Sequence, residues 1–333
     1  MNKNSMVELS DEQKIFVEKA LSGVNILVDA CIGSGKTTAI QHLCDVIPKD
    51  KKVLYLTYNK LLKLDAQSKI KNKNVLVTNY HGLAYRLLSN NGLSGGVSDM
   101  IQLAIDKVKE MPYYDVLIID EYQDIEEELA RFLERIKSVN PNIQIIAVGD
   151  MEQKIYDKTT LNVSTFINDF LGIYDRIEFT KCFRLSSELA DMLGRIWEKR
   201  IEGVNDKCIV EEMDVGQIVE FLKDAETCDV LCLGSRKGDM SNVLNQLEEE
   251  YPEKFNKKTV YASISDNESG STAPKTTSAI FTTYDSSKGL ERNICVIFDF
   301  TESYWSVRVK KPQTAYKILR NIFCVAASRG KTG

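Results

Sequence analysis

The residues Ala30–Thr37, with the sequence ACIGSGKT, have the composition and spacing of a phosphate-binding loop. Glycines in such a loop let backbone N–H groups approach phosphate oxygens, and the start of the following helix adds a positive dipole end. Lys36 would place its charge on the β- and γ-phosphates, and the Thr37 hydroxyl would bind a metal. The strict pattern has glycine at position 30, where this chain has alanine. We expect ATP and Mg2+ here, contacted by Gly33, Ser34, Gly35, Lys36 and Thr37.

Two adjacent carboxylates, Asp120 and Glu121, follow the apolar run Val116–Ile119. A carboxylate at the tip of a buried strand can hold magnesium through water, and its neighbour can accept a proton from an attacking water molecule. We therefore predict that Asp120 binds the metal and that Glu121 is the general base. The alternative interpretation, a solvated acidic start of a helix, suits Glu126–Glu128 better.

Short apolar runs rich in β-branched residues alternate with segments of helical periodicity, which is typical of a parallel α/β sheet flanked by helices. The expected strands are 25–29, 53–58, 74–78, 116–120, 143–149, 176–180, 229–233, 259–264, 279–283 and 294–300. The expected helices are 11–21, 36–46, 60–69, 81–89, 125–138, 187–200, 239–250 and 313–327. Because the strands are apolar almost throughout, we expect burial on both faces. The two series of strands predict two α/β domains, 1–179 and 180–333.

The bulk properties exclude several classes of protein. A chain of 333 residues with 43% hydrophobic residues can bury two cores, and its net charge of −5 gives no global basic signature. A local basic groove can still bind phosphates on an acidic protein. Eight scattered cysteines and two histidines argue against a zinc site or a disulfide framework. No signal peptide and no run of about 18 apolar residues is present, so we expect a cytoplasmic protein with no membrane partner.

The segments DEYQD at 120–124 and AVGDMEQKIY at 147–156 resemble motifs of the UvrD/Rep/PcrA-type superfamily 1A helicases. Other motifs of that family follow in the same order along most of the chain. The resemblance implies two RecA-like P-loop NTPase domains that hydrolyse ATP between them and act on single-stranded DNA with 3′-to-5′ polarity. It also implies roles for nucleotide-binding residues outside the loop: Gln13 and Phe183 at the adenine, Gly289 and Glu291 at the ribose, and Gln153, Arg184 and Arg329 at the γ-phosphate. Thr38 is also expected at the adenine, but it stands where the family often has an arginine that packs on the base.

The same resemblance implies which residues contact DNA, and it also has departures. The expected contacts are Tyr58, Asn59, Tyr80, His81, Tyr156, Thr283 and Lys288. However, residues 157–160 lack the aromatic residue that usually stacks on a base, which is worth about 1–3 kcal/mol. Asp285 stands where the family typically has histidine, and a carboxylate would repel a phosphate backbone.

The chain is also short for this family. It has room for only a small insertion at about 62–112, and the second domain ends directly after Arg329, so it is expected to be incomplete. Such a reduced motor resembles the helicase subunits that act beside a nuclease in Gabija-like antiviral defence. Two hypotheses therefore stay open: a DNA helicase or translocase, and an ATPase subunit that senses nucleotide and DNA and regulates a partner nuclease without unwinding.

Overall fold

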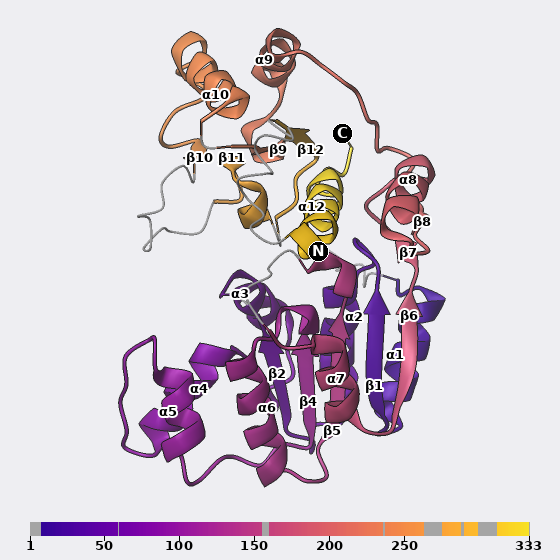
Figure 1. Cartoon of the computed structure of the whole chain (residues 1–333), viewed down its shortest axis with the longest axis vertical. Coiled ribbons are helices and arrows are strands. Elements are labelled where there is room, and N and C mark those ends of the chain that lie inside the picture. The colour runs from indigo at the N-terminus through magenta and orange to yellow at the C-terminus, as the bar shows by residue number, and fades with distance from the viewer. Residues whose placement is uncertain are drawn as a thin grey trace, which may run out of the picture. The chain divides into compact units, whose positions relative to one another are not determined.

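The chain forms two compact units in the computed structural model, which describes residues 8–58, 60–154, 160–235, 237–262, 275–287, 290–298 and 312–332 (Figure 1). Unit 1 comprises Met1–Cys31 and Gly35–Phe179, and unit 2 comprises Ile32–Ser34 and Thr180–Gly333. Most of the phosphate loop therefore belongs to unit 1, while its tip packs with unit 2. No helix within the described ranges is both long and apolar enough to cross a membrane.

Unit 1 is built on a six-stranded parallel sheet with the strand order β3-β2-β4-β5-β1-β6. Its strands are β1 (Asn25–Ala30), β2 (Val53–Thr57), β3 (Val75–Asn79), β4 (Val116–Asp120), β5 (Gln144–Gly149) and β6 (Tyr174–Phe179). All residues of β2 and β4 are buried, as expected for strands covered on both faces. The expectation is wrong for β6, because this edge strand exposes Arg176 and Glu178.

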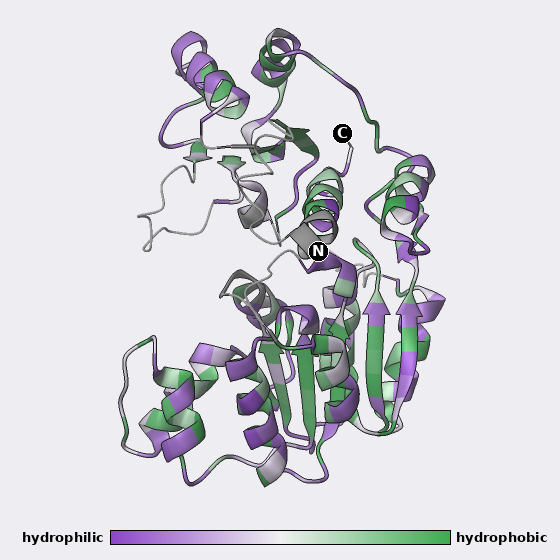
Figure 2. Cartoon of the chain, in the orientation of Figure 1, coloured by the Kyte–Doolittle hydropathy of each residue, from purple (hydrophilic) through white to green (hydrophobic). Residues whose placement is uncertain are grey.

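Alternate strand residues of unit 1 enter two different cores, and Figure 2 shows these strands as mainly hydrophobic. On one face Leu54 and Leu117 pack with α4 (Tyr80–Asn90), α5 (Met100–Lys107), α6 (Glu127–Val139) and α7 (Val163–Leu171). On the other face Tyr55 and Ile118 pack with α1 (Asp11–Leu21), α2 (Lys36–Val46) and α3 (Lys60–Lys69). The helices therefore cover both faces of the sheet, which buries the strands that carry the loop and the carboxylates.

Unit 2 contains a four-stranded parallel sheet with the order β10-β11-β9-β12. Its strands are β9 (Val230–Leu233), β10 (Val260–Ala262), β11 (Ala279–Thr282) and β12 (Ile294–Ile297), and a separate short pair joins β7 (Lys181–Cys182) to β8 (Glu202–Gly203). Its helices are α8 (Ser187–Trp197), α9 (Val215–Asp224), α10 (Asp239–Glu250) and α12 (Pro312–Ala327). Short 3-10 turns lie at Tyr122–Asp124, Met151–Gln153, Thr227–Asp229 and Tyr284–Ser287.

Five predicted elements have the bounds that the structure shows, the bounds of the others differ by one to three residues, and three helices among the described residues were not predicted. Both α7 and α9 begin at a capping residue: Asn162 accepts a hydrogen bond from the backbone of Thr165, and Asp214 forms a capping box with Gln217. These caps are readable in a sequence and could have revealed both helices. The third, α5, directly follows the glycine-rich stretch 90–99. The range predicted as an insertion also contains β3, which pairs with β2 in the main sheet.

Candidate functional site

The phosphate loop joins the end of β1 to the start of α2. Gly33 and Gly35 have φ values of 65° and 73°, in the left-handed region that favours glycine, and Gly35 is the N-cap of α2. A Cβ atom on Gly33 would lie 2.9 Å from both the Cys182 Sγ and the Arg184 Cβ, so only glycine fits there. The backbone N–H of Phe183 donates to the Gly33 carbonyl at 2.9 Å. The loop thus has the backbone shape of a phosphate cradle and a fixed tip.

The helix that follows the loop carries the two residues expected at the phosphates and the metal. Lys36 and Thr37 occupy the first two positions of α2, where unsatisfied N–H groups favour an anion. Lys36 is close enough to Asp120 to lower the pKa of that carboxyl group, although other effects are larger. The sequence therefore brings the loop, its lysine and the strand carboxylate to one edge of the sheet.

Asp120 ends β4 and is the most perturbed carboxylate of this edge. Burial and the neighbouring charge of Glu121 raise the pKa of Asp120 from 3.8 to about 7, against the lowering effects of Lys36, the Tyr55 hydroxyl and the backbone N–H of Glu121. The Tyr55 hydroxyl donates to Asp120 Oδ2 at 3.0 Å, while the buried Oδ1 accepts no hydrogen bond from any residue that the structure describes. A divalent cation would satisfy this oxygen and stabilise the charged form. Asp120 therefore fits the predicted role of metal ligand.

Glu121 follows directly and has an unusual backbone. Its φ of 56° and ψ of 49° place a residue with a side chain in the left-handed region, a conformation that costs about 1–3 kcal/mol and is often found at functional sites. The Gln123 amide nitrogen donates to the Glu121 carboxylate, and the Gln123 amide oxygen accepts the backbone N–H of Asp150 at 3.0 Å. Gln123 is fully buried. It thus connects the predicted base to the start of the next motif.

No role was predicted for Gln123, although it lies inside the DEYQD segment. A side chain on Gly149 would collide with the Gln123 amide oxygen and with the ring of Tyr122. Position 149 must therefore be glycine, because Gln123 and Tyr122 occupy the space that a side chain would need. The signal in the sequence was the polar Gln123 among residues that must be buried, because a buried amide needs partners.

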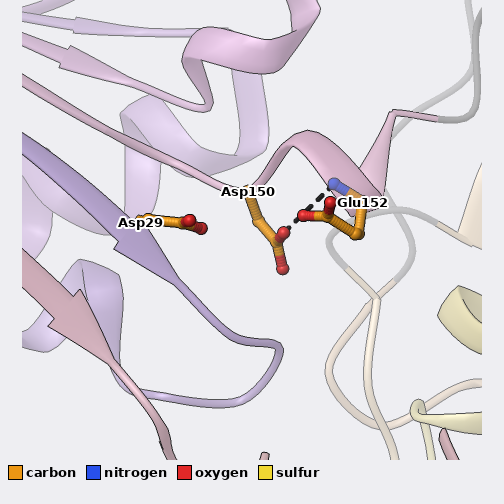
Figure 3. Close-up of side chains that lie close together, drawn as sticks. All are labelled: Asp29, Asp150 and Glu152. Carbon is orange, nitrogen blue, oxygen red and sulfur yellow. Dashed lines mark hydrogen bonds between the residues drawn. The ribbon is translucent and has the colours of Figure 1, made fainter. Parts of the chain in front are cut away.

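Gln153, predicted to sense the γ-phosphate, is buried in the turn after β5. Its amide nitrogen donates to Asp150 Oδ2 at 2.9 Å, and the backbone N–H of Glu152 donates to Asp150 Oδ1 at 3.1 Å. Figure 3 shows Asp150 and Glu152 beside Asp29 of β1, and one ligand oxygen of each lies within 4.8 Å of the others. Asp29 also accepts a hydrogen bond from Arg176 at 2.8 Å. Asp29 lies near Asp150 because β1 pairs with β5, which places Asp29 opposite Gly149.

Gln13 lies beside the phosphate loop, and its amide is engaged by the chain. The side-chain oxygen accepts the backbone N–H of Ser10 at 2.9 Å, and the nitrogen donates to the Gly35 carbonyl at 3.4 Å. These contacts cap α1 and attach it to the loop. In this conformation the groups predicted to read adenine are bound to backbone atoms, so Gln13 acts first as a support of the loop.

The residues predicted for the γ-phosphate and ribose in unit 2 contact one another. Arg184 forms an ion pair with Glu291, and the other oxygen of Glu291 lies 2.8 Å from Lys331 Nζ. Arg184 also donates to the Ser328 carbonyl at 3.2 Å. Burial alone would raise the pKa of Glu291, but Arg184 and Lys331 together lower it to about 2. Glu291 is therefore charged at neutral pH and ties two cations together.

Arg329, the predicted arginine finger, is buried in unit 2. Its Nε donates to the Val325 carbonyl at 2.9 Å, and its Nη1 donates to the Leu290 carbonyl at 3.4 Å. The exposed fraction of Arg329 is 4%. The side chain is therefore held by backbone carbonyls of its own unit, and acting on a phosphate would require it to exchange some of these bonds.

The remaining predicted residues have mixed placements. His81 is exposed, Tyr58 and Thr38 are half-buried, and Phe183 is 46% exposed, so its ring is open for stacking. Thr283 is half-buried, and its hydroxyl lies 3.3 Å from the hydroxyl of Ser286. The other predicted contacts fall outside the described residues: Asn59, Tyr156, Lys288 and Gly289.

Tyr80 was predicted to contact DNA, but its side chain is buried in unit 1. It is only 3% exposed and packs in the core beneath α4 with Leu83, Ala84 and Leu87. The spacing i, i+3, i+4, i+7 is that of the buried face of a helix, so this burial was readable in the sequence. Without a change in the fold, the Tyr80 ring is closed to a base.

Comparison with known proteins adds a family match over part of the chain. Residues 13–159, which include the phosphate loop and both carboxylates, match the family model described as an AAA domain. No curated protein sequence matches significantly. Within this region the structure brings Lys36 and Glu121 near Asp120.

Solved structures resemble the fold. The DUF1998 helicase MrfA bound to DNA is 12% identical, with a TM-score of 0.53, and the match covers 98% of this chain and 48% of MrfA. The Pif1 helicase from Candida albicans is 21% identical, with a TM-score of 0.45, over 72% of this chain and 55% of that protein. The chain thus spans about half the length of these proteins. The α/β class with a parallel sheet flanked by helices, as in RecA-like helicase folds, is confirmed.

Proposed function

We propose that this chain is a superfamily 1 motor that hydrolyses ATP and acts on single-stranded DNA. The observation that carries the proposal is Asp120, a buried carboxylate whose Oδ1 has no hydrogen-bond donor among the described residues. Burying such an oxygen is costly unless a cation is present to balance it. It ends a strand at the same edge of the sheet as the phosphate loop, which is where ligands bind in open α/β sheets.

In the proposed reaction, residues of unit 1 hold and activate the reactants. The loop amides and Lys36 bind the phosphates, and Asp120 and Thr37 hold magnesium, which when bound supplies positive charge to the phosphate oxygens. Glu121 accepts the proton of the attacking water, while Gln123 fixes the direction of its carboxylate.

Unit 2 contributes charge in this proposal. Arg184 and Arg329 neutralise the negative charge that develops on the γ-phosphate, because phosphoryl transfer depends on such neutralisation more than on covalent help. Both side chains are bound to groups of unit 2. ATP would have to compete for them, which would couple nucleotide binding to a rearrangement of unit 2.

The proposed substrate is single-stranded DNA, with UvrD-type 3′-to-5′ polarity. The ordered motifs described above support the subfamily and the polarity, and MrfA, whose fold is similar, has been solved with DNA. The exposed His81 is the described side chain that best fits a phosphate contact. A partner nuclease in the cytoplasm belongs to the same proposal and rests on the short spacings between the motifs, which leave room for only a small insertion at about 62–112.

One observation favours a second candidate, an ATPase that senses DNA and regulates a partner without unwinding. Tyr80, expected at the DNA, is part of the core. Together with the acidic Asp285 and the missing aromatic residue at 157–160, this reduces the number of expected DNA contacts. Weak binding of DNA would suit a sensor better than a processive helicase.

The deciding experiment is steady-state ATP hydrolysis with and without single-stranded DNA. We expect stimulation by DNA for the wild type and no hydrolysis for Lys36→Ala. The matched control is Lys49→Ala, which changes an exposed lysine outside the loop and should leave the rate unchanged. Hydrolysis that is indifferent to DNA would exclude the motor and leave the regulatory ATPase.

A second assay tests polarity. Duplexes with a 3′ or a 5′ single-stranded tail would be offered with ATP and Mg2+. Separation of the 3′-tailed duplex alone supports the proposed polarity, and separation of only the 5′-tailed duplex contradicts it. DNA-stimulated hydrolysis without any separation would indicate a translocase or a sensor.

A further inference from the structure

Asn205 links the two segments of unit 2 that carry Arg184 and Arg329. Its side-chain nitrogen donates to the backbone carbonyl of Arg184 at 2.7 Å and to that of Lys331 at 2.6 Å. A side-chain amide has two N–H groups, so both are used. Asn205 therefore joins the backbone of Arg184 to the backbone of Lys331, which lies two positions after Arg329.

Asn205 is itself held in place by its surroundings. Its backbone N–H donates to the Leu185 carbonyl at 3.0 Å, and its side-chain oxygen accepts the backbone N–H of Lys207 at 3.2 Å. It follows β8, which pairs with β7, and a side chain on Gly203 would collide with the Ser186 carbonyl. The amide thus approaches Arg184 and Lys331 from a constrained strand end and not from a free loop.

Side-chain contacts close the link into a ring. Arg184 pairs with Glu291, Glu291 pairs with Lys331, and Asn205 bonds to the carbonyls of both Lys331 and Arg184. The backbone of Lys331 is also fixed, because its N–H lies 3.0 Å from the Arg292 carbonyl. Each member therefore restrains the others.

We propose that Asn205 is a positioning residue that keeps Arg184 and Arg329 at a fixed separation for phosphoryl transfer. This inference rests on the proposed ATP hydrolysis. Asn205 touches neither arginine side chain through its amide and acts on their backbone segments, so it is expected to affect the rate of the chemical step more than the binding of ATP. The sequence patterns that identify the nucleotide site do not include this residue.

The test replaces Asn205 by aspartate and by alanine. Asn205→Asp has nearly the same shape but points a carboxylate at two carbonyl oxygens, and Asn205→Ala removes both donors. For both variants we expect kcat of ATP hydrolysis to fall by about 10–100-fold, since a displacement near 1 Å can cost about that much. KM for ATP should change little, and the aspartate should be the more severe variant.

The matched control is Asn256→Ala. Asn256 is also half-buried in unit 2, and its side-chain nitrogen donates to the Pro252 carbonyl at 2.9 Å, but it contacts neither arginine segment. We expect its Tm to fall as much as that of Asn205→Ala, with kcat unchanged. If both alanine variants lower kcat in proportion to Tm, Asn205 has only a structural role and the inference is wrong.

A double-mutant cycle adds a readout that a purely structural role would not move. If Asn205 acts through Arg184, then Asn205→Ala should cost little further activity once Arg184 is alanine. Full additivity would overturn the inference. Should the wild type hydrolyse no ATP at all, the proposed function fails, whereas an active wild type with an equally active Asn205→Ala refutes the positioning role alone.

Discussion

Two carboxylates predicted to act on the same nucleotide, Asp120 in unit 1 and Glu291 in unit 2, have opposite environments. Burial raises the pKa of Asp120 to about 7, whereas Arg184 and Lys331 overcome the effect of burial and lower the pKa of Glu291 to about 2. Asp120 is nearly inaccessible, but the side chain of Glu291 is 41% exposed. The carboxylate of Asp120 in unit 1 is therefore only partly balanced, whereas the carboxylate of Glu291 in unit 2 is neutralised by Arg184 and Lys331.

This difference shows what each unit needs from a ligand. A bound cation would give Asp120 Oδ1 the partner that it lacks among the described residues, so binding should stabilise unit 1. Glu291 must share Arg184 with any phosphate that approaches, so binding in unit 2 exchanges one partner for another. The site in unit 1 is thus preformed but strained. In unit 2 the residues Arg184, Glu291 and Lys331 already pair with one another, and a nucleotide would have to break some of these contacts.

The largest expected effect comes from Asp120→Asn. ATP hydrolysis should fall by about 100–1,000-fold, as for the loss of a preorganised electrostatic group. The same change removes a buried charge, so the ligand-free Tm at pH 8 should rise. Glu126→Gln, which alters an exposed carboxylate, is the control and should change neither quantity. A lower Tm for Asp120→Asn would contradict the strained character of unit 1.

Gln123→Ala should have the next largest effect. Glu121 would lose the amide that orients it, and Asp150 would lose its acceptor, so we expect kcat to fall by about 10–100-fold. The control is Gln102→Ala, since Gln102 is a half-buried residue of α5 whose side chain donates to Asp106 at 2.8 Å. An unchanged kcat would show that the strained backbone of Glu121 alone fixes the base.

The unit 1 site could largely be predicted from sequence. Apolar runs identify parallel strands, and such strands bring Asp120 and the phosphate loop to one edge, so chain order alone places them together. The left-handed backbone of Glu121 and the bridge made by Gln123 could not be read in this way, because they depend on how a turn packs against Gly149.

The unit 2 array was beyond sequence reasoning for a different reason. The Arg184–Glu291 pair joins residues 107 positions apart, and nothing in either local pattern specifies that distance in space. Asn205 lies in no motif at all. Tyr80 shows the opposite case, because its helical spacing with Leu83, Ala84 and Leu87 favours burial, whereas the resemblance to a DNA-contacting motif led us to expect a contact with DNA.

A pH profile separates the two carboxylates. Because the pKa of Asp120 is raised to about 7, its metal-binding charged form increases by about tenfold between pH 6 and 8, and kcat/KM should rise accordingly. Ligand-free stability should move the other way: between pH 4 and 7 the folded state keeps a proton that the unfolded state loses, so this contribution falls as pH rises. A flat profile would show that another group controls magnesium binding.

Glu291→Gln should have the smallest effect. The pKa of Glu291 is lowered to about 2, so its stabilising contribution is complete above its ordinary pKa near 4.5 and is lost as pH falls towards 2. Since the side chain is partly exposed, solvent screening limits the pair to about 1 kcal/mol or less. We expect a small fall in Tm at pH 7 and a smaller fall at pH 3, where part of the contribution has been lost, measured against Glu248→Gln on α10 as the control. The substitution should have two opposite effects on kcat of ATP hydrolysis. It frees Arg184 to act on the phosphate, but it also makes the position of Arg184 less fixed, so we expect little net change. A large loss of kcat would instead mean that Glu291 contacts the nucleotide directly, and unit 2 would then be a binding site and not only a source of charge.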